Sequence, residues 1–277
     1  MSPLIMDHES PDSSPSPPRQ ARSASFSISL AKYEDIRRLV DIEFFAFEHE
    51  KTNHVLSYRD HNQAAHLQRA IRSYQLLMRK AAALHRQWKA GRTIQQRRAV
   101  PDLEAARFRK VVDSDTGLII SWAKTENHAY TVEELASPAD VGHEGESQMN
   151  RDWFALNERL RRQYMGTRRH CYIGMVATQP AYQHHGAGTM LVQNILAEAD
   201  EAGIECYLEA TDTAKPLYER HGFMTVNELR FDPAAYGVYG YNVERQTIMV
   251  RGALDSRGQR QQVRSWEEAV PGVQAQL

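Results

Sequence analysis

The sequence has few cysteines and no long apolar run. Its two cysteines, Cys171 and Cys206, both fall in predicted core strands, so we expect reduced thiols in an intracellular protein and no disulfide framework. No apolar stretch approaches the length of a transmembrane helix, and the first residues lack the order of a signal peptide. We therefore expect a cytoplasmic protein without a membrane partner, with the nucleus as the alternative location.

Net charge is also nearly absent. The 277 residues carry 34 Lys and Arg against 35 Asp and Glu, a formal net charge of -1, which argues against a general nucleic-acid binder. A hydrophobic content of 42% suits a folded core, and a mean hydropathy of -0.60 indicates long polar stretches.

A glycine turn in the middle of the chain contains no lysine. Residues 176–188 read V-A-T-Q-P-A-Y-Q-H-H-G-A-G, after an apolar strand and before a helical run from Thr189. Gly186 and Gly188 permit positive φ and a close backbone approach, and the first N–H groups of a helix are unpaired. The turn therefore predicts an anion site in which backbone N–H groups bind phosphate.

Two common phosphate loops do not fit this turn. A P-loop requires Lys-Ser/Thr after its last glycine, where Thr189-Met190 stands. A dinucleotide loop requires a third small residue where Leu191 stands.

A third pattern does fit. Gln183, Gly186 and Gly188 give Gln-x-x-Gly-x-Gly between a strand and a helix, and residues 217–223 read L-Y-E-R-H-G-F with Ala214 four residues before Tyr218. These motifs resemble the acetyl-coenzyme A loop and the closing segment of the GNAT N-acetyltransferase superfamily, over residues of about 108 to 250. Residues 177–183 and 207–210 are similar to those of fungal GNAT-domain proteins, some of which accompany secondary-metabolite pathways.

The resemblance implies an α/β (α+β) fold of the GNAT acyl-CoA N-acyltransferase type. Its mixed, mostly antiparallel sheet has about six to seven strands, a V-shaped splay between the fourth and fifth strands, flanking helices and a helical insertion. We expect one domain over residues 25–251. Residues 1–24 are rich in Ser and Pro and are expected to be disordered, and residues 252–277 form a polar tail with a short helix around Trp266.

Two insertions interrupt the domain. The first, about 60–98, carries a long helix over residues 61–90, with an apolar stripe that includes Leu84, and residues 61–100 hold nine Lys or Arg and no acid. We favour a solvated helix face over a docking face for an anionic partner. The second, about 125–168, contains a Gly/Glu/Ser loop over residues 142–147 and a helix over residues 150–164, and could either select substrate or be a surface excursion.

The implied chemistry is transfer of an acetyl group from a thioester to an amine. Tyr218 would protonate the leaving thiolate, against the alternative of a core tyrosine beside Phe223. No acid lies in residues 170–178, where some relatives have a carboxylate base, which indicates a base reached through water or an amine that arrives neutral. Glu209, at the end of the next strand, is the proposed base, with a surface carboxylate or a partner for an arginine as its alternatives. Thr211 stands where many relatives have an asparagine.

The cofactor-binding residues follow from the same resemblance. Strand residues would offer backbone groups to the pantetheine arm, and the turn would hold the pyrophosphate. The predicted set is Met175, Val176, Ala177, Thr178, Gln183, His184, His185, Gly186, Ala187, Gly188, Thr189, Thr211 and Ala214. His184 and His185 have no third ligand at usable spacing, so no metal is expected.

The predicted function is an acetyl-CoA-dependent N-acetyltransferase that acetylates a primary amine of a small molecule by direct attack in a ternary complex. The expected partners are acetyl-CoA and that amine, in a monomer or homodimer, without nucleic acid. Two alternatives stay open: a protein or histone N-acetyltransferase that docks through the basic helix, and a non-catalytic acyl-CoA-binding module.

Overall fold

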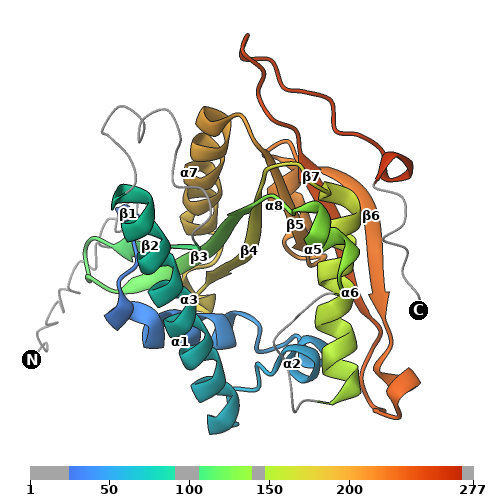
Figure 1. The fold of residues 1–277 in the computed structure, drawn as a ribbon. Helices are drawn as coiled ribbons and strands as arrows, with labels where there is room; N and C mark the ends of the chain where they lie inside the picture. Colours follow the sequence, from blue (N-terminus) through green and yellow to red (C-terminus); the bar gives the residue numbers. More distant parts are fainter. Residues whose placement is uncertain (1–24, 91–105, 139–146, 270–277) are drawn as a thin grey trace, which may run out of the picture.

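A computed structural model describes residues 25–90, 106–138 and 147–269 (Figure 1). Several expectations fall outside these residues: the disordered segment 1–24, the end of the first insertion after residue 90, most of the Gly/Glu/Ser loop and the last residues of the polar tail. Within the described ranges, no helix is both long enough and apolar enough to cross a membrane.

Seven strands form one sheet in the order β1-β2-β3-β4-β5-β7-β6. The strands are β1 (Phe26–Leu30), β2 (Arg107–Asp113), β3 (Ile119–His128), β4 (His170–Thr178), β5 (Glu205–Ala210), β6 (Met224–Phe231) and β7 (Glu244–Arg251). Only β4 and β5 run parallel, and every other neighbouring pair is antiparallel. The predicted mixed, mostly antiparallel sheet is confirmed.

The splay between the fourth and fifth strands is confirmed as well. Strand β4 pairs with β5 only over His170–Tyr172, opposite Glu205–Tyr207. Beyond Tyr172 the edge of β4 that faces β5 has no strand partner among the described residues, so its backbone groups on that side are available to a ligand.

A β-bulge at Gly174 accompanies the separation. On β3, Lys124 pairs with Met175 and Thr125 with Ile173, which leaves Gly174 as the extra residue of β4. One extra residue reverses the side-chain alternation of a strand. Ile173 therefore packs on one face of the sheet, while Met175, of the same parity, packs on the other.

Helices cover both faces of the sheet (Figure 1). They are α1 (Ile36–Ala46), α2 (Lys51–Ser57), α3 (Ala64–Ala90), α5 (Val132–Ala136), α6 (Gln148–Met165), α7 (Ala187–Ala202) and α8 (Lys215–Glu219). Short 3-10 turns lie at Tyr33–Asp35, Pro180–Tyr182, Pro233–Tyr236 and Trp266–Glu268.

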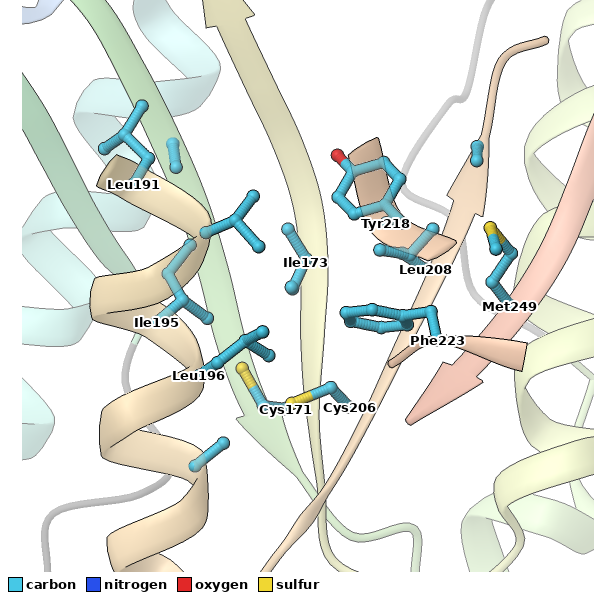
Figure 2. Packing of buried hydrophobic residues seen from close by; sticks show 14 of the residues in the cluster. Cys171, Ile173, Leu191, Ile195, Leu196, Cys206, Leu208, Tyr218, Phe223 and Met249 are labelled. Atoms are coloured by element: carbon cyan, nitrogen blue, oxygen red, sulfur yellow. The ribbon is translucent and has the colours of Figure 1, made fainter. Parts of the chain in front are cut away.

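Helix α7 packs on the face where the main hydrophobic core lies (Figure 2). Its buried stripe, which includes Leu191 and Ile195, meets Ile173 of β4 and Leu208 of β5. Cys171 and Cys206 face each other across β4 and β5 in this core, and both are free thiols.

The opposite face is covered by α1, α3 and α6. Tyr74 and Met78 of α3, the helix of the first insertion, pack against buried residues of α1. The helix holds neither Gly nor Pro over its 27 residues, which favours a long uninterrupted helix. Leu84, which the apolar stripe included, is instead 40% exposed, because only the first part of α3 contacts α1.

Helix α6 and the segment after β7 complete this face. Trp153 of α6 is buried with Tyr207 and Ile248 of the sheet. After β7 the chain folds back, and Trp266 stacks on Tyr164 of α6 with ring centroids 5.3 Å apart.

Candidate active site

The glycine turn joins the end of β4 to the start of α7. Gly186, at the N-cap of α7, has φ +91°, and an added Cβ would meet nothing within 4 Å. His184 also takes positive φ, at +63°, which the sequence did not suggest. Gly188 instead lies in the first turn of the helix, where a Cβ would be in ordinary contact, 3.6 Å from Thr178 Oγ1. Positive φ is therefore required at Gly186 and not at Gly188.

The start of α7 leaves backbone donors open. The Met190 N–H donates to the Gly186 carbonyl at 2.9 Å, and this is the first bond of the helix. The N–H groups of Ala187, Gly188 and Thr189 precede it and have no partner within the helix. With the helix dipole they form a cradle suited to a phosphate.

The side chains of the turn play a different part. Gln183 Nε2 donates to the Thr178 carbonyl at 3.3 Å, which ties the turn to the end of β4. His184 and His185 are exposed, and the Nδ1 of His185 lies 2.6 Å from the Gln183 carbonyl. Among the described residues no group of three metal-ligating side chains forms.

A cavity of about 170 Å³, here called the inner cavity, occupies the gap where β4 and β5 diverge. From the strands and α8 it is lined by Tyr172, Ile173, Gly174, Met175, Val176, Glu209, Ala210, Thr211, Ala214 and Tyr218. Six of the predicted site residues thus come together here. Ala177, Thr178 and the residues of the turn do not line this cavity and lie along β4 and at the start of α7.

A second cavity of about 740 Å³, here called the outer cavity, adjoins the first on the face covered by α1, α3 and α6. The two cavities share Tyr172, Gly174, Met175 and Glu209 on the strands, and Ser57, Arg59, Phe154 and Asn157 from the helical face. The inner cavity therefore connects the gap in the sheet to a space of the size that small ligands occupy.

Tyr218 reaches the inner cavity from α8. Its ring is 6% exposed and packs edge-on against Phe223 with centroids 5.6 Å apart. The hydroxyl points away from Phe223 and Leu208 (Figure 2), and no described residue hydrogen-bonds to it. Burial raises the pKa of the phenol, so it stays protonated through the neutral range. Tyr218 therefore both packs in the core beside Phe223 and lines the inner cavity.

Glu209 reaches the same cavity from the opposite face of the sheet. Successive residues of a strand point to opposite faces, so Glu209 lies on the face of Tyr207, while Leu208 packs with α7. Burial raises the pKa of its carboxyl, and the nearby charge of Arg161 works against that rise. Its Oε1 is buried and has no hydrogen-bond partner among the described residues.

Thr211 stabilises the turn before α8. Its hydroxyl accepts the Ala214 N–H at 3.3 Å, and its carbonyl accepts the N–H groups of Ala214 and Lys215. The threonine therefore closes the turn that starts α8, while Ala214, at the N-cap, keeps the cavity wall small.

Sequence reasoning missed three residues of the site. The Arg161 guanidinium lies 4.0 Å from the centroid of the Tyr172 ring, beside Glu209. Gly174 carries the bulge, and an isolated glycine within a strand is the signal that could have indicated it. Nothing in the local sequence around Arg161 or Tyr172 marks either residue, because only the packing of α6 against the sheet brings them together.

One protein-family model matches part of the chain. Residues 149–223 match the sequence model of the Acetyltransferase (GNAT) family, a segment that runs from α6 to the residue before β6. No curated protein sequence matches the chain.

Solved structures resemble the chain in fold. Mosquito arylalkylamine N-acetyltransferase like 5b is 14% identical, with a TM-score of 0.53 over 82% of this chain and 99% of that chain. A structure from Corynebacterium glutamicum, described as histone acetyltransferase HPA2 and related acetyltransferase, is 19% identical, with a TM-score of 0.45 over 82% and 95%. A phosphinothricin acetyltransferase from Sinorhizobium meliloti, in complex with acetyl-CoA, is 12% identical, with a TM-score of 0.48 over 89% and 96%.

Proposed function

We propose that this chain, which carries a GNAT acetyltransferase domain, is an acetyl-CoA-dependent N-acetyltransferase that acetylates the primary amine of a small molecule. One observation carries the proposal: Tyr218 and Glu209 enter a single cavity from opposite faces of the sheet, at the point where β4 and β5 separate. An acid and a base on opposite sides of a reacting centre suit a transfer in which one group loses a proton and another gains one.

The described residues fit the parts of acetyl-CoA. The open N–H groups at the start of α7 suit its pyrophosphate, and no side chain of the turn fills the space above Gly186. The unpaired edge of β4 from Ile173 onwards suits the amides of the pantetheine arm, by the hydrogen bonding of an added strand. The arm would then bring the thioester to the inner cavity.

The proposed steps assign one proton transfer to each residue. The acceptor amine enters through the outer cavity, and Glu209, whose raised pKa makes it a better base, takes its proton directly or through a water. The nitrogen attacks the thioester carbonyl, and the carbon–sulfur bond breaks as the amide forms. Tyr218 donates its proton to the departing thiolate.

The outer cavity favours a small acceptor over a protein. Its walls come from α1, α3, α6 and the sheet, and its volume of about 740 Å³ falls within the range of small-ligand sites. A protein N-acetyltransferase is the second candidate, because α3 carries no acidic residue and presents an exposed basic surface. A non-catalytic acyl-CoA-binding module would not need the pairing of Tyr218 with Glu209.

Acetylation assays on the purified protein test the proposal. The protein is incubated with labelled acetyl-CoA and either a panel of small amines or cell extract, and label is followed by mass spectrometry, with CoA affinity measured by calorimetry. Label in small amines supports the proposal. Label confined to proteins selects the second candidate, and CoA binding without label selects the binding module. A fungal origin, a role in secondary metabolism and a cytoplasmic location stay predictions, and expression of the tagged chain tests the last.

A further inference from the structure

Charged side chains line much of the outer cavity, and most of them are paired with one another. Three ion pairs form within its wall: Arg59–Glu43, Lys124–Glu126 and Arg161–Glu158. The first two pairs neutralise themselves. Glu158 also pairs with Arg162, and the charge of Arg161 acts on the Glu209 carboxyl as well.

Two further charged groups line the cavity: the Glu209 carboxyl, which Arg161, Tyr172 and Tyr207 neighbour, and the Arg72 guanidinium. Glu209 lies where the outer cavity meets the inner one, and its Oε1 is buried without a hydrogen-bond partner among the described residues. Arg72 lines the outer cavity from α3 and is exposed, and in the described part of the chain no carboxylate pairs with it. The cavity thus has a carboxyl group at its inner end and an exposed cation on its wall.

Arg69 adds to that positive wall. It lies one helical turn before Arg72 on the same face of α3, with its guanidinium 4.6 Å from the centroid of the Tyr58 ring. Burial lowers the pKa of Arg69, and the neighbouring charge of Arg72 lowers it further. Since α3 contains no acid, Arg72 has no carboxylate partner on its own helix.

The phosphates of CoA are poor candidates for these arginines. The cradle for them lies at the start of α7, which packs on one face of the sheet, while α3 packs on the other. The wall of the outer cavity is also partly apolar, with Leu77, Met175 and Phe154. A ligand that fits would have an ammonium end, an apolar body and an anionic end.

We infer that the acceptor is an amine that also carries an anionic group, a carboxylate or a phosphate, which Arg72 binds while the amine faces Glu209. This inference rests on the proposed function, because it names the substrate class of the same site. A charge-assisted hydrogen bond from a guanidinium to such an oxygen is among the stronger polar contacts available to a ligand.

Matched acceptors and matched variants test the inference. The ω-amino acids β-alanine, γ-aminobutyrate and ε-aminocaproate are compared with the corresponding amino alcohols, and aminoalkyl phosphates form a third arm. Each is assayed for kcat and KM with wild type, Arg72→Gln and Arg86→Gln. Arg86 is an exposed cation of the same helix that lines neither cavity, so its variant removes the same charge elsewhere.

We expect wild type to prefer at least one anionic acceptor over its alcohol by about tenfold or more in kcat/KM, equivalent to ~1.4 kcal/mol. Arg72→Gln should abolish the preference by raising KM for the anionic acceptor alone, and Arg86→Gln should keep it. Equal use of acids, phosphates and alcohols by wild type, or an Arg72→Gln effect that is the same for all three, would overturn the inference while leaving the N-acetyltransferase proposal intact.

A binding measurement separates the two proposals when no amine is acetylated. The same compounds are titrated by calorimetry into protein saturated with CoA. Binding of an anionic amine that Arg72→Gln weakens about tenfold supports the inference even if catalysis fails. Absence of binding by every anionic amine overturns it, and absence of CoA binding as well overturns the proposed function.

Discussion

Replacing Tyr218 by phenylalanine removes one oxygen atom from a side chain that lines the inner cavity. The ring would still pack against Phe223, and the lost hydroxyl has no hydrogen-bond partner among the described residues. The free energy of unfolding should therefore change by less than about 0.5 kcal/mol. Because the pantetheine edge of β4 and the cradle at α7 are untouched, affinity for CoA should stay nearly constant.

Turnover should respond quite differently. A positioned general acid contributes about 10²–10⁴-fold, so Tyr218→Phe should lower kcat by at least about 100-fold, or ~2.7 kcal/mol of activation free energy. Burial raises the pKa of this phenol, so wild-type activity should show no loss from its ionisation across neutral pH. The assay measures kcat, KM for acetyl-CoA, CoA affinity and urea unfolding on the same preparations.

Tyr236→Phe is the matched control. Tyr236 donates its hydroxyl proton to Asp152 at 2.8 Å and lines neither cavity. Its loss should cost up to about 1 kcal/mol of stability and leave kcat unchanged. If Tyr218→Phe retained kcat within about threefold of wild type while the control behaved as expected, Tyr218 would not be the general acid.

Three further predictions concern the base, the turn and the fold. Arg161 lowers the pKa of Glu209, as the Tyr172 and Tyr207 phenols do. Arg161→Gln removes this cation, so the acidic limb of the pH profile of kcat/KM should move to higher pH. An unmoved limb would contradict Glu209 as the base. Gly186→Ala places a Cβ on a residue with φ +91°, a backbone strain of about 1–2 kcal/mol. Calorimetry should find CoA affinity about tenfold lower, whereas equal affinity would argue against phosphate binding at the start of α7. Burial raises the pKa of the Asp200 carboxyl, but hydrogen bonds led by the one from Arg251 outweigh burial and lower this pKa from 3.8 to about 2. Asp200 therefore contributes about 2 kcal/mol of stability above pH 4, and this contribution is lost as pH falls towards 2. Urea unfolding of Asp200→Asn should show that difference at pH 7 and a smaller one near pH 3, and an equal difference at both values would refute the linkage.

Local sequence patterns predicted the elements that are defined by neighbouring residues. The turn at Gly186 could be identified because positive φ before a helix start favours glycine. The helix that carries Tyr218 and the strand that follows Phe223 lie where the closing motif indicated, since a few adjacent residues determine both. The long helix of the first insertion was likewise evident from its composition. Its composition did not indicate which part of the helix would pack against α1.

The face of the sheet to which each side chain of β4 points could not be predicted in the same way. Regular alternation would place Ile173 and Met175 on one face, and the bulge at Gly174 puts them on opposite faces. A bulge depends on the register with β3, which a single strand does not contain.

By itself the sequence determined the order of strands and helices, the glycine turn and the tyrosine of the closing motif, because each depends on residues close together in the chain. Only the tertiary structure decided that Glu209 and Tyr218 line one cavity from opposite faces of the sheet, that Arg161 of α6 lies beside that carboxylate, and that Arg72 of α3 faces the adjoining outer cavity. Arg161 and Arg72 lie far from Glu209 in sequence, and their positions come from how the two insertions pack against the sheet. Glu209 and Tyr218 are close in sequence, and the pairing of β4 and β5 decides that a cavity separates them.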